Sequence, residues 1–98
     1  MSIIAHIVLH SMTTEQYDAV RAEVGWLVRP PTGGLSHVTW WEGNDCHIID
    51  AWDSEEAFAR FGEDRLGPAL AKLGITSEQD VEFHPAHEVF APRAITLT

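Results

Sequence analysis

The chain has 98 residues, close to the common size of one domain, so we expect a single domain over residues 1–98. A formal net charge of −9 with only six Lys and Arg argues against a nucleic-acid partner, because a phosphate backbone requires clustered positive charge. No apolar run is long enough to span a membrane and no signal-peptide pattern opens the chain, so we expect a cytoplasmic protein without a membrane partner. Cys46 is the single cysteine, which excludes an internal disulfide.

The first third of the chain predicts a strand, a helix and a loop. Residues 3–10 (IIAHIVLH) form a strand pattern with apolar residues on both faces. Thr13 followed by Gln16 fits a capping box that opens a helix through about Val24. The buried stripe of this helix contains Tyr17, and the Pro/Gly-rich residues 30–34 predict a loop after it.

The centre of the chain predicts a hairpin followed by a second helix. Residues 36–42 and 46–52 are rich in β-branched and aromatic side chains, and residues 43–45 (Gly-Asn-Asp) favour a tight turn between them. Asp53 or Ser54 can cap the helix that follows, and Asp53 with Glu56 fits a capping box.

The last third predicts a re-started helix and a final strand. Gly67-Pro68 interrupts the second helix, residues 68–73 resume it, and Gly74 ends it. Residues 81–90 predict the last strand, in which Pro85 indicates an edge position or a bulge. The apolar tail, residues 91–98, has no assigned place.

The order βαββαβ predicts an α+β, ferredoxin-like fold: an antiparallel four-stranded sheet with two helices on one face. The first strand is apolar on both faces, and Trp40 and Trp41 point to opposite sides of the hairpin. The face without helices would therefore expose a large apolar patch, which a partner normally covers. A second copy of the chain is the simplest partner, so we expect a homodimer joined through its sheet faces.

The chain resembles the dimeric α/β barrel superfamily, and more narrowly small bacterial proteins related to the antibiotic biosynthesis monooxygenases. The residues that carry this resemblance are 34–37, 48–58, 65–69, Phe61 and Gly74. The resemblance implies a pocket between sheet and helices that binds a small aromatic molecule. In the oxygenases of that group, flat phenolic polyketide intermediates are oxidised by dioxygen without metal or flavin, so no cofactor is expected. The superfamily also contains isomerases, haem degraders and members of unknown role.

His37 and Asp50 are the candidate catalytic residues. A histidine at the start of a strand can take a proton at neutral pH, although it can equally bond the backbone and order the loop before it. Asp50 lies in an otherwise apolar strand and needs a partner if it is buried, which a structural role would also satisfy. A two-residue turn at Gly43-Asn44 would pair these two residues directly, whereas a three-residue turn would place them on opposite faces.

Aromatic residues are the candidate substrate contacts, although such residues more often form only a core. They are Trp41, Trp52, Phe58 and Phe61, and His6 is added to them. No metal site is expected, because the remaining histidines show no recognised ligand spacing. His6 and His10, for example, share a strand face but are about 13 Å apart.

Three functions remain open at this point. The first is a cofactor-independent monooxygenase-like enzyme, or a related proton-transfer or cyclisation enzyme, acting on an aromatic molecule. The second is a non-catalytic binding or structural homodimer. The third is a subunit of a larger enzyme, which only the apolar residues 94–98 suggest.

Overall fold

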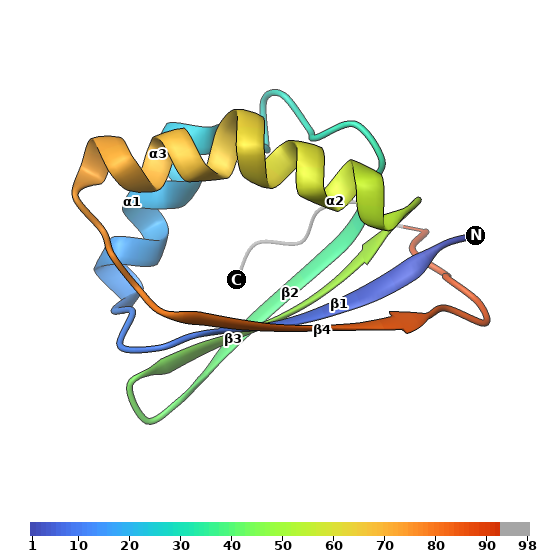
Figure 1. The fold of residues 1–98 in the computed structure, drawn as a ribbon, viewed down its shortest axis with the longest axis horizontal. Coiled ribbons are helices and arrows are strands. Elements are labelled where there is room, and N and C mark those ends of the chain that lie inside the picture. The colour runs from blue at the N-terminus through green and yellow to red at the C-terminus, as the bar shows by residue number, and fades with distance from the viewer. Residues whose placement is uncertain (93–98) are drawn as a thin grey trace.

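The computed structural model describes residues 1–92 and has the predicted order of elements (Figure 1). The elements are β1 (Ile3–Leu9), α1 (Thr14–Val24), β2 (Gly34–Glu42), β3 (Asp45–Trp52), α2 (Glu55–Phe61), a π-helical turn (Gly62–Leu66), α3 (Gly67–Leu73) and β4 (Gln79–Pro85). Residues 94–98, on which the larger-enzyme hypothesis depends, lie outside the described residues.

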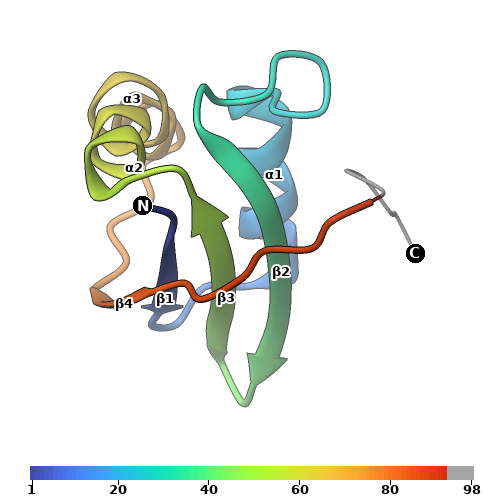
Figure 2. The ribbon, with the colours of Figure 1, turned by 90° about the vertical axis from the view of Figure 1, so that its right-hand side faces the viewer.

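The four strands form one antiparallel sheet in the order β2-β3-β1-β4. The helices lie on one face of this sheet. On that face α1 lies beside β2, and the α2–α3 helix lies toward the edge formed by β1 and β4 (Figure 2). The ferredoxin-like prediction is therefore confirmed. No helix within residues 1–92 combines the length and the apolar character that a membrane crossing requires.

The hairpin has the two-residue turn. Glu42 pairs with Asp45, and Gly43 adopts a positive φ of 62° at the turn. Because side chains alternate along a strand, this register decides which residues of β2 and β3 share a face. It places His37 directly opposite Asp50.

The core lies between the sheet and the helices. Alternate residues of β1 are buried on this side, from Ile3 to Leu9, and they contact buried Cys46, Ile48 and Trp52 of β3. A second group around Val20 and Val24 joins α1 to Ala69 of α3. The alternation of exposure along β1 is the period-2 pattern of a sheet that is covered on one face.

Both observed N-caps, Thr13 and Ser54, are among the residues that the sequence predicts. The Thr13–Gln16 capping box is present, with both hydrogen bonds formed. The predicted Asp53–Glu56 capping box is wrong: Ser54 is the N-cap, and its hydroxyl accepts from the Ala57 N–H at 3.1 Å. Because Ser54 caps one residue later, Asp53 is left outside the helix.

The predicted re-started helix, 68–73, corresponds to α3 (Gly67–Leu73), and the predicted interruption is a π-helical turn just before it. Gly67 keeps a helical conformation, and its N–H donates to the carbonyl of Gly62, five residues earlier. Pro68 lies in the first turn of α3, where its missing N–H costs little. The π-helical turn therefore lets the chain pass through Pro68 without leaving the helix.

The last strand ends at Pro85 and not at residue 90. Pro85 pairs with Ile3 at the end of the ladder, and the next hydrogen bond runs from the Ala86 N–H to the Ser2 carbonyl. β4 is an edge strand, as the proline predicts, because proline cannot donate to a sheet ladder.

The face without helices carries exposed apolar and aromatic side chains. Val38 and Trp40 of β2 are 58% and 38% exposed. Trp40 stacks on His47 and His6, with ring centroids 5.0 and 6.0 Å away. The predicted exposed patch is therefore present on a single chain.

Candidate functional site

His37 and Asp50 meet on the helix-facing side of the sheet. They are direct partners in the β2–β3 ladder, and His37 Nδ1 lies 2.6 Å from Asp50 Oδ1. The Asp50 side chain is buried, whereas about a third of the His37 side chain is exposed. The pair thus joins a buried carboxylate to an imidazole that solutes can reach.

Both oxygens of Asp50 have partners. Oδ1 faces His37, and Oδ2 accepts from the indole N–H of Trp52 at 3.1 Å. These bonds offset the cost of burying a carboxylate, which would be large for an unpaired group. Since an ionised carboxylate can only accept, the proton of the His37–Asp50 bond belongs to Nδ1.

A third residue, Tyr17 of α1, completes the group. Its hydroxyl lies 2.7 Å from His37 Nε2, and its ring is nearly parallel to the imidazole, at an interplanar angle of 8°. With Nδ1 protonated, the neutral imidazole offers Nε2 as an acceptor, so the Tyr17 hydroxyl is the donor. A chain of hydrogen bonds therefore runs from Tyr17 through His37 and Asp50 to Trp52.

Aromatic rings surround this chain. The ring centroid of Trp26, in the loop after α1, lies 4.9 Å from that of His37 and 6.1 Å from that of Tyr17. Trp41 packs edge-on against Tyr17 at 5.6 Å, and its indole N–H donates to the Met12 carbonyl at 2.7 Å. Flat rings around a polar group are typical of sites for planar molecules.

Three hydrogen bonds hold the loop that carries Trp26. Arg65 donates to the carbonyls of Val24 and Arg29 at 2.8 and 2.7 Å, and its guanidinium lies over the Phe61 ring. At the far end, the Asp53 N–H donates to the Gly33 carbonyl at 2.8 Å. The loop is therefore held at one end by Arg65 of the π-helical turn and at the other by Asp53, just before α2.

Burial raises the pKa values of two groups on this side of the sheet. The pKa of Tyr17 rises to about 12, mainly because the phenol is partly removed from water, although a hydrogen bond with Thr39 acts in the opposite direction. The pKa of Cys46 rises to about 11 for the same reason. Cys46 is therefore a neutral core thiol and a poor nucleophile at physiological pH.

The structure separates the other predicted contacts into two groups. Trp52, Phe58 and Phe61 form one aromatic cluster under α2, with Trp52 centroids 5.7 and 5.4 Å from the two phenylalanines. This cluster meets the site through the Trp52–Asp50 bond and through Trp26, which contacts Phe61. His6 lies on the opposite face of the sheet, where it contacts His47, and it is not brought together with His37.

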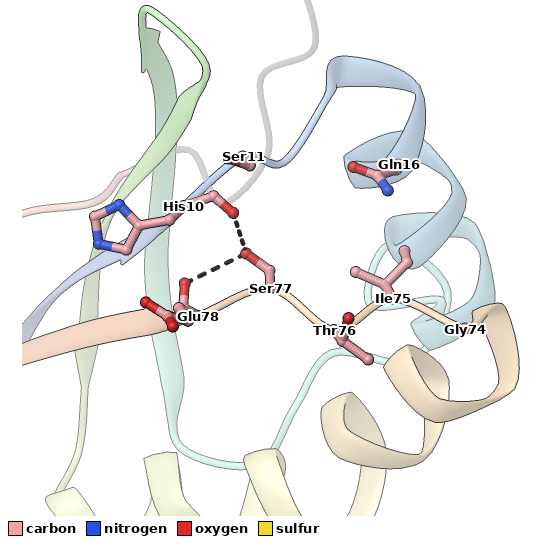
Figure 3. A pocket seen from close by; sticks show the side chains of 8 residues that line it. All are labelled: His10, Ser11, Gln16, Gly74, Ile75, Thr76, Ser77 and Glu78. Carbon is pink, nitrogen blue, oxygen red and sulfur yellow. Dashed lines mark hydrogen bonds between the residues drawn. The ribbon is translucent and has the colours of Figure 1, made fainter.

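Two hollows of the described chain lie elsewhere. One of about 370 Å³ lies between the turn after β1, the first turn of α1 and the segment that joins α3 to β4, and its lining includes Gln16, Ile75 and Glu78 (Figure 3). The other, of about 530 Å³, lies beside residues 86–91 and includes Ser2 and Leu35. Neither contains His37 or Asp50, so the candidate site on the single chain is a partly exposed aromatic surface.

Within residues 1–92, no three His, Cys, Asp or Glu side chains gather closely enough to hold a metal ion.

Tyr17 and Trp26 are absent from the residues that the sequence singles out. From the sequence, Tyr17 is predicted only to lie in the buried stripe of its helix, and Trp26 has no predicted role. The sequence does carry one signal: the apolar stripe of 14–24 must face the sheet, so a phenol within it must find a polar partner there.

No protein-family model matches the sequence, and the comparison with curated proteins gives no significant match. Solved structures do match over nearly the whole chain. NE2512, a protein of unknown function from Nitrosomonas europaea, has a TM-score of 0.70 at 12% identity, over 95% of this chain and 96% of that one. A candidate antibiotic biosynthesis monooxygenase from Caulobacter crescentus has a TM-score of 0.69 at 17% identity, over 89% and 91%.

SnoaB, a cofactor-independent oxygenase from Streptomyces nogalater, has a TM-score of 0.62 at 16% identity, over 94% of this chain and 97% of that one. At these identities the likeness shows a shared fold. The resemblance to antibiotic biosynthesis monooxygenase-like proteins is confirmed at that level.

Proposed function

We propose that this protein is a cofactor-independent monooxygenase-like enzyme that deprotonates a small, flat aromatic molecule of the polyketide type. One observation carries the proposal: an accessible imidazole, His37, is oriented by a buried carboxylate, Asp50, among aromatic rings. The shared fold with a cofactor-independent oxygenase supports the same reaction class.

In this proposal His37 is the base and Asp50 is its positioning partner. Nε2 takes up a proton as the substrate loses one, and the negative charge of Asp50 stabilises the imidazolium that forms. The substrate keeps the electron pair of the broken bond, and the resulting anion can transfer an electron to dioxygen. Trp26 and Trp41 are placed to hold the ring, with Trp52, Phe58 and Phe61 behind them.

We propose further that two copies associate through the sheet faces that carry Val38 and Trp40. Exposed apolar surface of this kind normally marks an interaction site. A two-fold axis through these faces would leave both His37–Asp50 pairs on the helix-covered sides, since the helices lie on the opposite face of the sheet.

The test is oxygen uptake with a panel of hydroquinones and anthrones. We expect the wild type to consume oxygen. The rate of oxygen uptake should fall about 10²-fold or more in His37→Gln, the size typical of a positioned general base. His87→Gln is the matched control, because His87 is an exposed histidine after β4 and is not part of the group formed by Tyr17, His37 and Asp50. Neither uptake nor binding anywhere in the panel would refute the enzyme proposal.

A non-catalytic binding dimer is the second candidate. It is favoured by the observation that both imidazole nitrogens of His37 already have partners. It predicts that His37→Gln and Asp50→Asn leave ligand affinity nearly unchanged and that no turnover is found with any bound compound.

A further inference from the structure

The position of Tyr17 bears directly on how a proton reaches His37. Nδ1 of the imidazole is engaged by Asp50 at 2.6 Å, and Nε2 by the Tyr17 hydroxyl at 2.7 Å. A substrate cannot bond either nitrogen while both contacts are kept. The nearest oxygen that it can approach on this chain of bonds is the Tyr17 phenol.

The Tyr17 oxygen retains capacity to accept. Its proton points to Nε2, and a phenolic oxygen can still receive hydrogen bonds from other donors. The ring is only half-buried and lies among Trp26, Trp41 and the imidazole, so a flat molecule that stacks here brings its hydroxyl to Tyr17.

We propose that Tyr17 is a catalytic residue that meets an acidic hydroxyl of the substrate, a phenol or an enol, and relays its proton to His37. This inference rests on the proposed function. The substrate O–H bond breaks as a new O–H bond forms on Tyr17, while the original Tyr17 proton moves to Nε2. The electron pair stays on the substrate oxygen, Tyr17 is neutral before and after, and His37 becomes an imidazolium beside Asp50.

A concerted transfer suits this environment better than a free tyrosinate. Burial disfavours the charged phenolate, as the pKa of about 12 shows. The imidazolium, in contrast, forms next to a carboxylate whose two oxygens are already paired. After the transfer, the Tyr17 hydroxyl donates to the substrate anion and so stabilises it.

A direct mechanism makes the opposite prediction. If the substrate displaced Tyr17 and bonded Nε2 itself, the tyrosine would compete with it. Removing the hydroxyl would then leave deprotonation unchanged or improve it.

The test uses 4-nitrophenol, whose absorbance differs between the neutral and the ionised form. We expect the wild type to bind it and to increase its ionised fraction. In Tyr17→Phe the bound probe should be ionised about tenfold less, the size expected when a hydrogen bond to a charged group is lost. His37→Gln should lose the ionisation altogether, and His87→Gln should match the wild type.

The outcomes separate the two proposals. Ionisation in Tyr17→Phe equal to or above that of the wild type overturns the relay and leaves the proposed function standing. Failure of the wild type to bind 4-nitrophenol, or binding of the neutral form alone, overturns the proposed function and the relay together.

A second measurement applies even if Tyr17→Phe fails to fold. Tyr17 is the only tyrosine of the chain, so growth on 3-fluorotyrosine labels this position alone. The single ¹⁹F resonance should shift when 4-nitrophenol binds, and His37→Gln should alter that shift. A resonance that does not respond to the bound probe overturns the contact on which the relay depends.

Discussion

Asp50 is the residue on which the site depends most. It is a carboxylate in a buried strand, and it holds His37 through one oxygen and Trp52 through the other. Its removal would leave a buried indole N–H without a partner and would free the imidazole to rotate. Structure and proposed chemistry thus depend on the same side chain.

We therefore expect Asp50→Ala to destabilise the fold by about 1–3 kcal/mol, the usual cost of leaving buried hydrogen-bonding groups unsatisfied. Urea unfolding measures this change. Asp18→Ala, at an exposed position of α1, is the matched control and should change stability little. Equal stability of the two variants would show that the Asp50 bonds contribute nothing to folding.

His10 predicts a pH dependence. Its pKa is raised, first by a hydrogen bond to Asp80 at 2.8 Å and further by Asp45, although desolvation opposes both. Because the pKa of His10 is higher in the folded than in the unfolded state, its protonation contributes to the free energy of unfolding. This contribution is complete below about pH 6.5 and is lost as the pH rises through the folded-state pKa. The pKa of Asp45 is lowered, mainly by the Ser11 N–H, so its contribution is lost in acid, as pH falls below about 3.8.

The expected result is that His10→Asn destabilises the protein more at pH 5.5 than at pH 8.5, both pH values being about one to two units from the reference histidine value. Urea unfolding of wild type and variant at the two pH values measures the difference. His87→Asn serves as the control and should show no such trend. A larger effect of His10→Asn at the alkaline pH would contradict the assignment.

At the scale of elements, Gly33 is the point at which the loop before β2 packs closely against α2. It has a φ of +84°, and a Cβ placed there would lie 2.7 Å from Cβ of Ala57. Gly43 in the hairpin turn also has positive φ, but a Cβ there would meet nothing within 4 Å. Both glycines therefore have a positive φ, but only at Gly33 would an added Cβ also clash with a neighbouring side chain.

We expect Gly33→Ala to cost more than Gly43→Ala, which should carry only the backbone penalty of about 1–2 kcal/mol. Thermal or urea unfolding of the two variants compares them. Ala57→Gly should partly rescue Gly33→Ala in a double-mutant cycle, because it removes the opposing methyl group. An additive double mutant would rule out the clash.

The elements could be predicted where local chemistry decides them. Thr13 and Gln16 specify a helix start, and Gly43-Asn44 specifies the turn, because these effects act over a few residues. Pro68 marks the start of the last helical segment, whereas no local residue signals the π-helical turn that precedes it.

The site was predictable in part. The sequence allows two hairpin registers, and only the one with a two-residue turn pairs His37 with Asp50. The structure has this turn. Tyr17 lies 20 residues from His37 and meets it only because α1 packs over β2, which is a tertiary relation. His6 is among the predicted substrate contacts. It alternates with the buried residues of β1, as Ile4 and Val8 do, and therefore lies on the other face of the sheet.

For the whole molecule, the exposed sheet face makes the dimer testable. Trp40→Glu would place a charge within the proposed interface, so we expect it to yield monomers in analytical ultracentrifugation. Val28→Glu is the matched control: Val28 is also exposed but lies in the loop after α1, and its variant should stay dimeric. A monomeric wild type would refute the interface.

The account as a whole depends on an imidazole whose Nε2 carries no proton and can therefore accept one. Nitrogen-15 NMR of the His37 ring, in neutral form and without ligand, tests this most directly. We predict a protonated Nδ1 bonded to Asp50 and an unprotonated Nε2 that accepts from Tyr17. A ring with the proton on Nε2 would leave no acceptor facing Tyr17, and it would contradict both the base and the relay.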